Sequence, residues 1–159
     1  MRLNHAQGDE LTSLLCVPLL VQAALMFVDD LHFHRQRGLP RWERVGHPID
    51  TLSVLICYGV ALTQPPSSAA LTAYAALAIL SCVLITKDEF VHSRRCVAGE
   101  QWLHSLLFVL HPIVLGATAL LWFKHKTAIV AGQSALTLAF GCYQLLYWNL
   151  PWTRHPRAQ

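Results

Sequence analysis

The chain has 159 residues, of which 54% are hydrophobic and 13% are charged, and its formal net charge is +3. Soluble domains average about 25% charged residues, so this composition excludes an ordinary soluble domain and indicates an integral membrane protein. The positive charge comes mostly from arginines between apolar segments, which bears on membrane topology, and we expect no nucleic-acid partner. Five cysteines without Cys-x-x-Cys spacing predict no disulfide framework.

Five apolar segments are candidates to cross a membrane as helices. The first follows Asp9 and Glu10 and has no small-residue cleavage site, which predicts a retained helix and not a signal peptide. The second begins at Pro48, whose missing N–H costs nothing in a first helical turn. We therefore predict an all-α integral membrane bundle, one domain spanning 1–159. Its five transmembrane helices cover approximately residues 11–30, 48–63, 69–92, 101–123 and 127–150.

Basic residues predict the orientation of the bundle. They concentrate in the first and third predicted loops, at Arg35, Arg37, Arg41, Arg44, Lys87, Arg94 and Arg95. The positive-inside bias places both loops in the cytoplasm, so the N-terminus is expected outside and the C-terminus in the cytoplasm, with a bacterial inner (plasma) membrane as the location. Because alternate loops of a spanning chain share one face, we expect these two loops to converge.

Two polar stretches, residues 29–50 and 88–111, interrupt this apolar sequence. They contain six of the nine histidines and every acidic residue after Glu10. Such side chains are costly beside hydrocarbon unless they pair or bind a metal. Acid and imidazole recur at i,i+3 or i,i+4, which puts them on one helix face. The pairs are Asp29/His32, Asp30/His34, His47/Asp50, Asp88/His92, Glu89/His92 and Glu100/His104.

The polar stretches predict a metal centre near the cytoplasmic face. The candidate ligands are Asp29, His32, His34, His47, Asp50, Glu89, His92, His104 and His111. Glu89 is preferred to Asp88 because Glu89–His92 is similar to the Glu-x-x-His motif of ferritin-like di-iron bundles. Either Asp29 or Asp30 would be the ligand. His111 projects about 10 Å deeper than His104, given a rise of 1.5 Å per residue. Cys96 is expected to be a bystander, and Glu100 to favour a helix N-terminus.

Mixed histidine and carboxylate ligation favours iron, with zinc or manganese as alternatives. The ligands outnumber the four that a tetrahedral zinc needs, which favours two metal ions. We therefore expect an enzyme, an oxidoreductase that activates dioxygen to hydroxylate, desaturate or cleave a membrane lipid or similar substrate. A separate cytoplasmic electron donor would be needed. The alternatives are a zinc-dependent hydrolase of a lipid amide or ester, and a non-enzymatic metal transporter or sensor. The HxxxH and HxxHH motifs of membrane desaturases are absent, and the sequence identifies no family.

Overall fold

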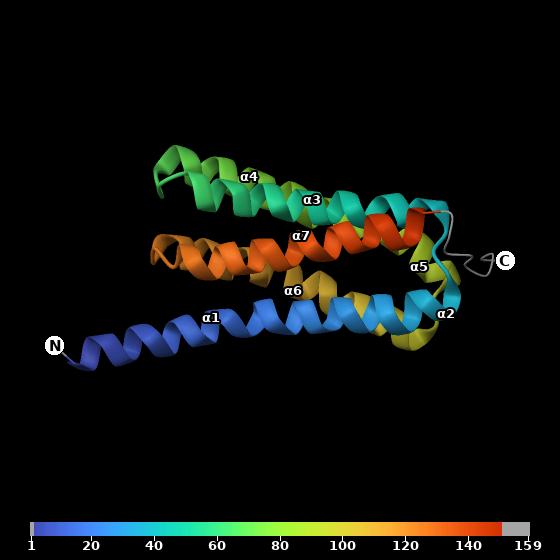
Figure 1. Cartoon of the computed structure of the whole chain (residues 1–159), viewed down its shortest axis with the longest axis horizontal. Helices are drawn as coiled ribbons and strands as arrows, with labels where there is room; N and C mark the ends of the chain where they lie inside the picture. The colour runs from blue at the N-terminus through green and yellow to red at the C-terminus, as the bar shows by residue number, and fades with distance from the viewer. Residues whose placement is uncertain (1, 151–159) are drawn as a thin grey trace.

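The structure, a computed structural model, describes residues 2–150. The described residues form helices and no strand, in an elongated bundle (Figure 1). The elements are α1 (Arg2–Val28), the π-helix η1 (Asp29–His34), α2 (Arg35–Arg37), α3 (Arg41–Thr63), α4 (Ser68–Ile85), the 3-10 turn η2 (Thr86–Asp88), α5 (Glu89–Arg95), α6 (Ala98–Phe123) and α7 (Thr127–Asn149). The all-α prediction is confirmed.

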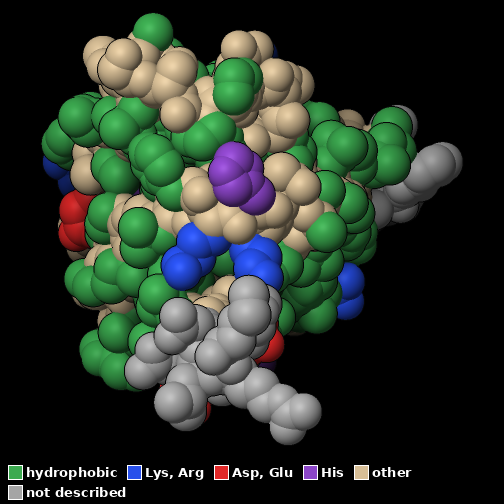
Figure 2. Space-filling view, turned by 90° about the vertical axis from the view of Figure 1, so that its left-hand side faces the viewer, with side chains coloured by type: hydrophobic (Ala, Val, Ile, Leu, Met, Phe, Trp, Pro, Cys, Tyr) green, Lys and Arg blue, Asp and Glu red, His purple; other side chains and the backbone are tan. Residues whose placement is uncertain are grey.

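Five of the described helical segments are long and apolar enough to cross a membrane, as predicted. They are Gly8–Arg37, Arg41–Thr63, Ser68–Arg95, Ala98–Phe123 and Thr127–Asn149. Large hydrophobic side chains such as Leu14, Ile79 and Leu146 are exposed on these helices, and the end-on view of Figure 2 shows hydrophobic side chains around the rim of the bundle. The C-terminal tail beyond Leu150 lies outside the described residues.

The start of the second spanning helix was predicted wrongly. Helix α3 begins at Arg41, so Pro48 lies inside it and not in its first turn. Pro48 has no N–H to donate to the Arg44 carbonyl, and Asn149 Nδ2 donates to that carbonyl instead at 3.5 Å. Most of the predicted first loop is therefore helical. The chain turns between α2 and α3 at Gly38, whose φ of 76° favours glycine.

An apolar core fills the half of the bundle away from the polar stretches. Leu19, Tyr58, Leu121 and Trp122 are among its buried members. Two of its aromatic side chains bond their polar atoms to the backbone: the Tyr74 hydroxyl donates to the Leu115 carbonyl at 2.7 Å, and the Trp122 indole N–H donates to the Gln64 carbonyl at 2.9 Å. This half of the molecule is held together by close packing of apolar side chains.

The packing brings the two polar stretches to the same end of the bundle, as predicted. In Figure 1 this is the end that carries α2, α5 and the end of α7. Helix α3 lies close to α7 at Gly141, where an added Cβ would meet Thr51 Cγ2 at 2.8 Å. Helix α1 packs against α6. These pairs hold η1, α3, α5 and α6 around one buried space.

Candidate metal centre

A π-helical turn in the first spanning segment brings Asp29 and His34 together. In an α-helix residues five apart point about 140° away from each other, whereas the i→i+5 bonding of a π-helix aligns them. In η1 the His34 Nε2 atom lies 3.2 Å from Asp29 Oδ2, and both side chains are buried. The same turn leaves His32 exposed, where its ring contacts Gln36.

Four imidazoles meet at the polar end of the bundle. His34 comes from η1, His47 from α3, His92 from α5 and His104 from α6. The rings of His34 and His47 stack with centroids 5.0 Å apart, and those of His92 and His104 stack at 3.8 Å. The centroids of His34 and His104 are 6.0 Å apart, which joins the two pairs into one cluster.

Arg37 holds two carboxylates at one edge of the imidazole cluster. Its guanidinium donates to both oxygens of Glu43, at 3.2 and 2.7 Å, and to Glu100 Oε1 at 2.9 Å. Glu43 and Glu100 are both buried. Glu43 Oε1 lies 3.9 Å from His92 Nε2, and Glu100 Oε1 lies 3.8 Å from His34 Nε2. Arg37 is therefore an internal clamp as well as a basic residue of the predicted loop.

Lys87 holds a second carboxylate pair at the opposite edge. Its ammonium group contacts Asp50 Oδ2, and it lies 3.2 Å from Asp88 Oδ1. Asp88 Oδ2 lies 3.7 Å from His47 Nδ1. Gly46 makes room for this arrangement, since a Cβ there would lie 3.1 Å from Lys87 Cε. Each carboxylate pair thus has one cation, and each lies beside at least one imidazole of the cluster.

Two further aspartates complete the cluster. Asp29 Oδ2 accepts a hydrogen bond from His104 Nε2 at 2.9 Å, so it contacts two of the imidazoles. Asp30 lies one layer out: it accepts hydrogen bonds from the Tyr143 hydroxyl at 2.6 Å and the Trp148 indole N–H at 2.9 Å. Its Oδ1 lies 3.6 Å from His34 Nδ1, on the side where an outer carboxylate orients an imidazole.

Counted with ionised carboxylates and neutral imidazoles, the described part of this cluster carries more negative than positive charge. Six buried or half-buried carboxylates belong to it, and Arg37 and Lys87 are the only lysine or arginine side chains in the described residues that form ion pairs with them. The carboxylates are Asp29, Asp30, Glu43, Asp50, Asp88 and Glu100.

Imidazole nitrogens in the cluster lack hydrogen-bond partners. Both ring nitrogens of His34 and of His92 are buried without one, as are His47 Nε2 and His104 Nδ1. Buried polar atoms in native proteins are almost always bonded to the protein, to water or to a bound ion. Together with the uncompensated carboxylates, these atoms fit divalent cations well.

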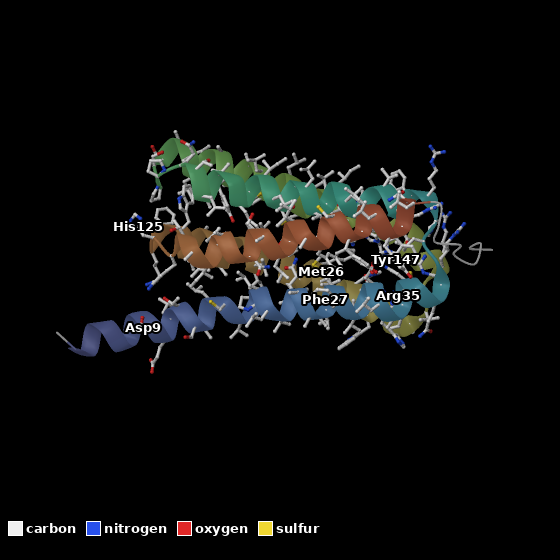
Figure 3. All side chains as sticks on the ribbon, viewed as in Figure 1. Asp9, Met26, Phe27, Arg35, His125 and Tyr147 are labelled. Atoms are coloured by element: carbon white, nitrogen blue, oxygen red, sulfur yellow. The ribbon has the colours of Figure 1, made fainter. Side chains whose placement is uncertain are left out.

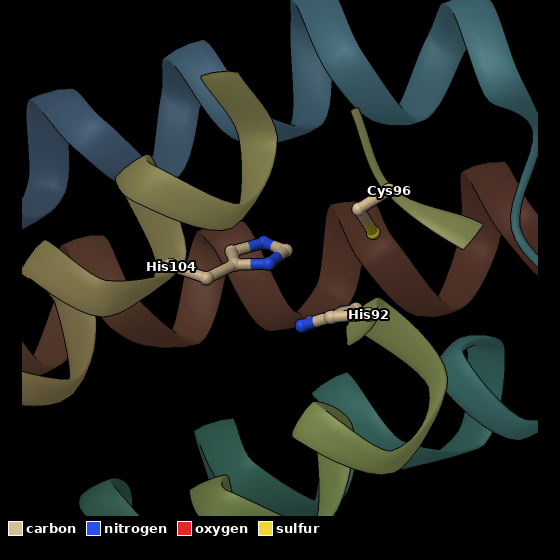
Figure 4. Close-up of side chains that lie close together, drawn as sticks. All are labelled: His92, Cys96 and His104. Atoms are coloured by element: carbon tan, nitrogen blue, oxygen red, sulfur yellow. The ribbon is translucent and has the colours of Figure 1, made fainter. Parts of the chain in front are cut away.

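The geometry offers four overlapping sets of ligand atoms within 4.8 Å of one another. They are Asp29/His34/Glu100/His104, His34/Glu43/His47, His47/Asp50/Asp88 and His92/Cys96/His104. Figure 4 shows the last set, in which the Cys96 side chain lies to one side of the two rings. Burial raises the pKa of the Cys96 thiol, which keeps it protonated and makes it a poor ligand beside the imidazoles and carboxylates.

The structure brings six of the nine predicted ligands into the cluster: Asp29, His34, His47, Asp50, His92 and His104. His32 and Glu89 are exposed and belong to none of the sets. Glu89 points away from the cluster. Asp88 lies four residues before His92, and it is Asp88 that is buried together with His92. His111 is buried deeper and bonds to the Ser81 hydroxyl at 2.9 Å, so it lines the same cavity without joining a ligand set.

Sequence reasoning missed Glu43 and undervalued Asp88 and Glu100. Glu43 precedes His47 by four residues, and this is the same spacing that singled out the other acid and histidine pairs. The roles of Arg37 and Lys87 had no sequence signal, because a basic residue beside a membrane helix is expected for topology alone.

The chain matches no family model, no curated protein and no solved structure.

Proposed function

We propose that the chain is a membrane metalloenzyme that holds two iron ions and activates dioxygen to oxidise a lipid-like substrate. The oxidation would hydroxylate, desaturate or cleave a hydrocarbon chain. The observation that carries this proposal is the largely buried cluster of four imidazoles and six carboxylates, with which two cations of the described residues form ion pairs. Iron would supply the oxygen chemistry that amino-acid side chains lack.

Charge balance supports two metal ions. With neutral imidazoles and ionised carboxylates, the two cations of the described residues leave four carboxylates uncompensated, and two divalent ions would neutralise them. An uncompensated buried charge is strongly unfavourable, so the apparent excess needs a partner. The ligand sets also fall into two regions, one around Asp29 and His104 and one around Asp50 and Asp88, with His34 and His47 stacked between them.

The surroundings of the cluster support a hydrophobic substrate. The imidazoles line a cavity of about 130 Å³ whose other walls include Met26, Val54 and Phe108. These walls belong to helices that can cross a membrane. A substrate drawn from the bilayer would reach the metal centre without passing through water.

The basic residues support a cytoplasmic position for the cluster and hence for the electron donor. Seven lysines and arginines flank the cluster end in the sequence, whereas Lys124 and Lys126 lie in the turn at the other end. The positive-inside bias would place the cluster end on the cytoplasmic side of a bacterial inner membrane. A separate donor docking there would supply the electrons.

Metal analysis tests this proposal most cleanly. We expect protein purified in detergent from iron-replete cells to contain about two irons per chain. After reduction with dithionite, the protein should consume dioxygen as the iron is reoxidised. The variants His47→Ala and His92→Ala should lose iron, whereas the matched control His125→Ala, in the turn before α7, should keep it.

Two results would contradict the proposal. A single redox-inactive zinc per chain would favour hydrolysis of a lipid amide or ester, because a zinc-bound water is a nucleophile and not an oxidant. Full iron content in both His47→Ala and His92→Ala would show that the metal binds elsewhere.

A further inference from the structure

The cavity at the imidazole cluster is longer than a metal centre requires. On α3 its lining runs from His47 to Tyr58, and on α7 from Gln144 to Gln133. Eleven residues of α-helix cover about 16 Å. The cavity volume of about 130 Å³ is spread over that length, so the cavity is narrow. A narrow cavity of this length suits one extended chain better than a fused-ring molecule.

The middle of the cavity is apolar. Met26 and Phe27 line it from α1, Val54 from α3, Leu107 from α6 and Phe140 from α7. Beyond the cluster, no lysine, arginine, aspartate or glutamate of the described residues lines it. Each methylene of a hydrocarbon chain would gain about 0.8 kcal/mol by leaving water for such walls. The walls therefore select a hydrocarbon segment.

The cavity reaches the outer surface of the bundle between α1 and α7. Phe27 and Leu136 both line the cavity, yet these residues are 41% and 40% exposed. The rings of Phe27 and Phe140 meet edge to face at 5.2 Å across this seam. Figure 3 labels Met26 and Phe27 on the stretch of α1 beside α7. The seam lies within spanning segments, so a chain would enter sideways from the hydrocarbon of the bilayer.

The end of the cavity away from the cluster is polar and uncharged. Gln22, Tyr58, Gln133 and Thr137 line it. Gln22 Oε1 is buried without a hydrogen-bond partner, whereas the Tyr58 hydroxyl interacts with Gln133 and Thr137. A neutral group such as a hydroxyl or amide would satisfy the Gln22 side chain. A carboxylate or phosphate would find no cation there.

Building on the proposed function, we propose that the substrate is a single long aliphatic chain with a neutral polar group. The chain enters between α1 and α7, and its polar group binds beside Gln22 and Tyr58. The Gln22 end would then act as a stop, which places a carbon about 16 Å along the chain against the imidazole cluster. Oxidation would occur at a fixed distance from the polar group.

Photolabelling of the metal-free protein tests chain binding independently of the metal. The probe is hexadecanol with a diazirine in its chain, in detergent after chelation. We expect labels on cavity-lining residues of α1 and α7, and about a tenfold loss of labelling in Ala23→Trp, which fills the cavity. The matched control is Leu20→Trp, three residues away on an exposed part of α1 and outside the cavity lining. Equal labelling in both variants would overturn the proposal.

A second comparison tests the polar stop. Unlabelled hexadecanol should compete with the probe better than hexadecane, and Gln22→Leu should reduce this preference about fivefold because one hydrogen bond is lost. An unchanged preference would overturn the assignment of Gln22. If Ala23→Trp fails to fold, Leu136→Trp blocks the same seam from α7.

The outcomes separate this inference from the proposed function. Labelling of the cavity in a protein that binds no metal would refute the metalloenzyme and leave the chain site intact. Iron binding with no labelling of the cavity would refute the chain site and leave the metalloenzyme proposal intact.

Discussion

The two ends of this bundle solve the burial of polar atoms in different ways. At the apolar end, Tyr74 and Trp122 bury their polar atoms and bond them to carbonyls of the same chain. At the cluster end, imidazole nitrogens of His34 and His92 are buried without hydrogen bonds beside carboxylates in excess. The comparison shows that apolar packing dominates the first end, whereas the second concentrates buried imidazoles and carboxylates, for which we propose bound cations as partners. The variants below test this difference, from the largest expected effect to the smallest.

Removal of the Arg37 clamp should have the largest effect. Arg37→Met leaves Glu43 and Glu100 buried without their cation, and breaking a buried pair in this way costs about 3–5 kcal/mol. The free energy of unfolding, measured by denaturation with sodium dodecyl sulfate, should fall by that amount. The exposed Arg41→Met is the control. Equal stability of the two variants would show that the clamp contributes little.

A cavity at the apolar end should destabilise the protein and spare the metal. Leu121 is fully buried in the apolar core, and Leu121→Ala should cost about 2–5 kcal/mol. The iron content of the folded fraction should stay unchanged, because no ligand set includes a core residue. Loss of iron in this variant would mean that the two ends are not independent.

Two adjacent acids distinguish the observed face of α5 from the face predicted by sequence. Asp88→Asn should weaken metal binding by about tenfold or more, since Asp88 lies in a ligand set with His47 and Asp50. Glu89→Gln is the matched control and should change nothing, because Glu89 is exposed. Titration of the metal-free variants with ferrous ion measures both affinities. If Glu89→Gln instead weakens ferrous-ion binding more than Asp88→Asn does, Glu89 is the ligand, as the Glu-x-x-His motif predicted.

The smallest effect is expected at Cys96. Cys96→Ser should retain the full iron content, because burial raises the pKa of this thiol and the imidazoles and carboxylates nearby suffice as ligands. An intense sulfur-to-iron absorption band that Cys96→Ser abolishes would instead make the thiolate a ligand.

The sequence predicted the fold because its signals are local. Long apolar segments mark the spanning helices, and alternation of loops brings residues 29–50 and 88–111 together. It could not predict the start of α3, because a proline in a helix interior is disfavoured by local propensity, and the Asn149 amide that contacts the freed Arg44 carbonyl is distant in the sequence.

The candidate site was predicted where α-helical spacing holds and missed where it fails. The pairs Glu100/His104 and His47/Asp50, which helical spacing predicted, each share a ligand set in the structure. Asp29 was expected to pair with His32 on an α-helix. The π-helical turn at Asp29 places its carboxylate beside His34 instead. Nothing in the local sequence signals that turn, because it is stabilised by tertiary contacts of the aspartates with His104, Tyr143 and Trp148.

The central claim is that the buried imidazole and carboxylate cluster binds metal ions. An anomalous difference map, recorded at the iron absorption edge from crystals of protein purified without added chelator, tests it most directly. We predict two peaks within the cluster, one beside Asp29 and His104 and one beside Asp50 and Asp88, with His34 and His47 between them. A fully occupied cluster that contains only waters, with no anomalous signal at the edge of iron, manganese or zinc, would contradict the account.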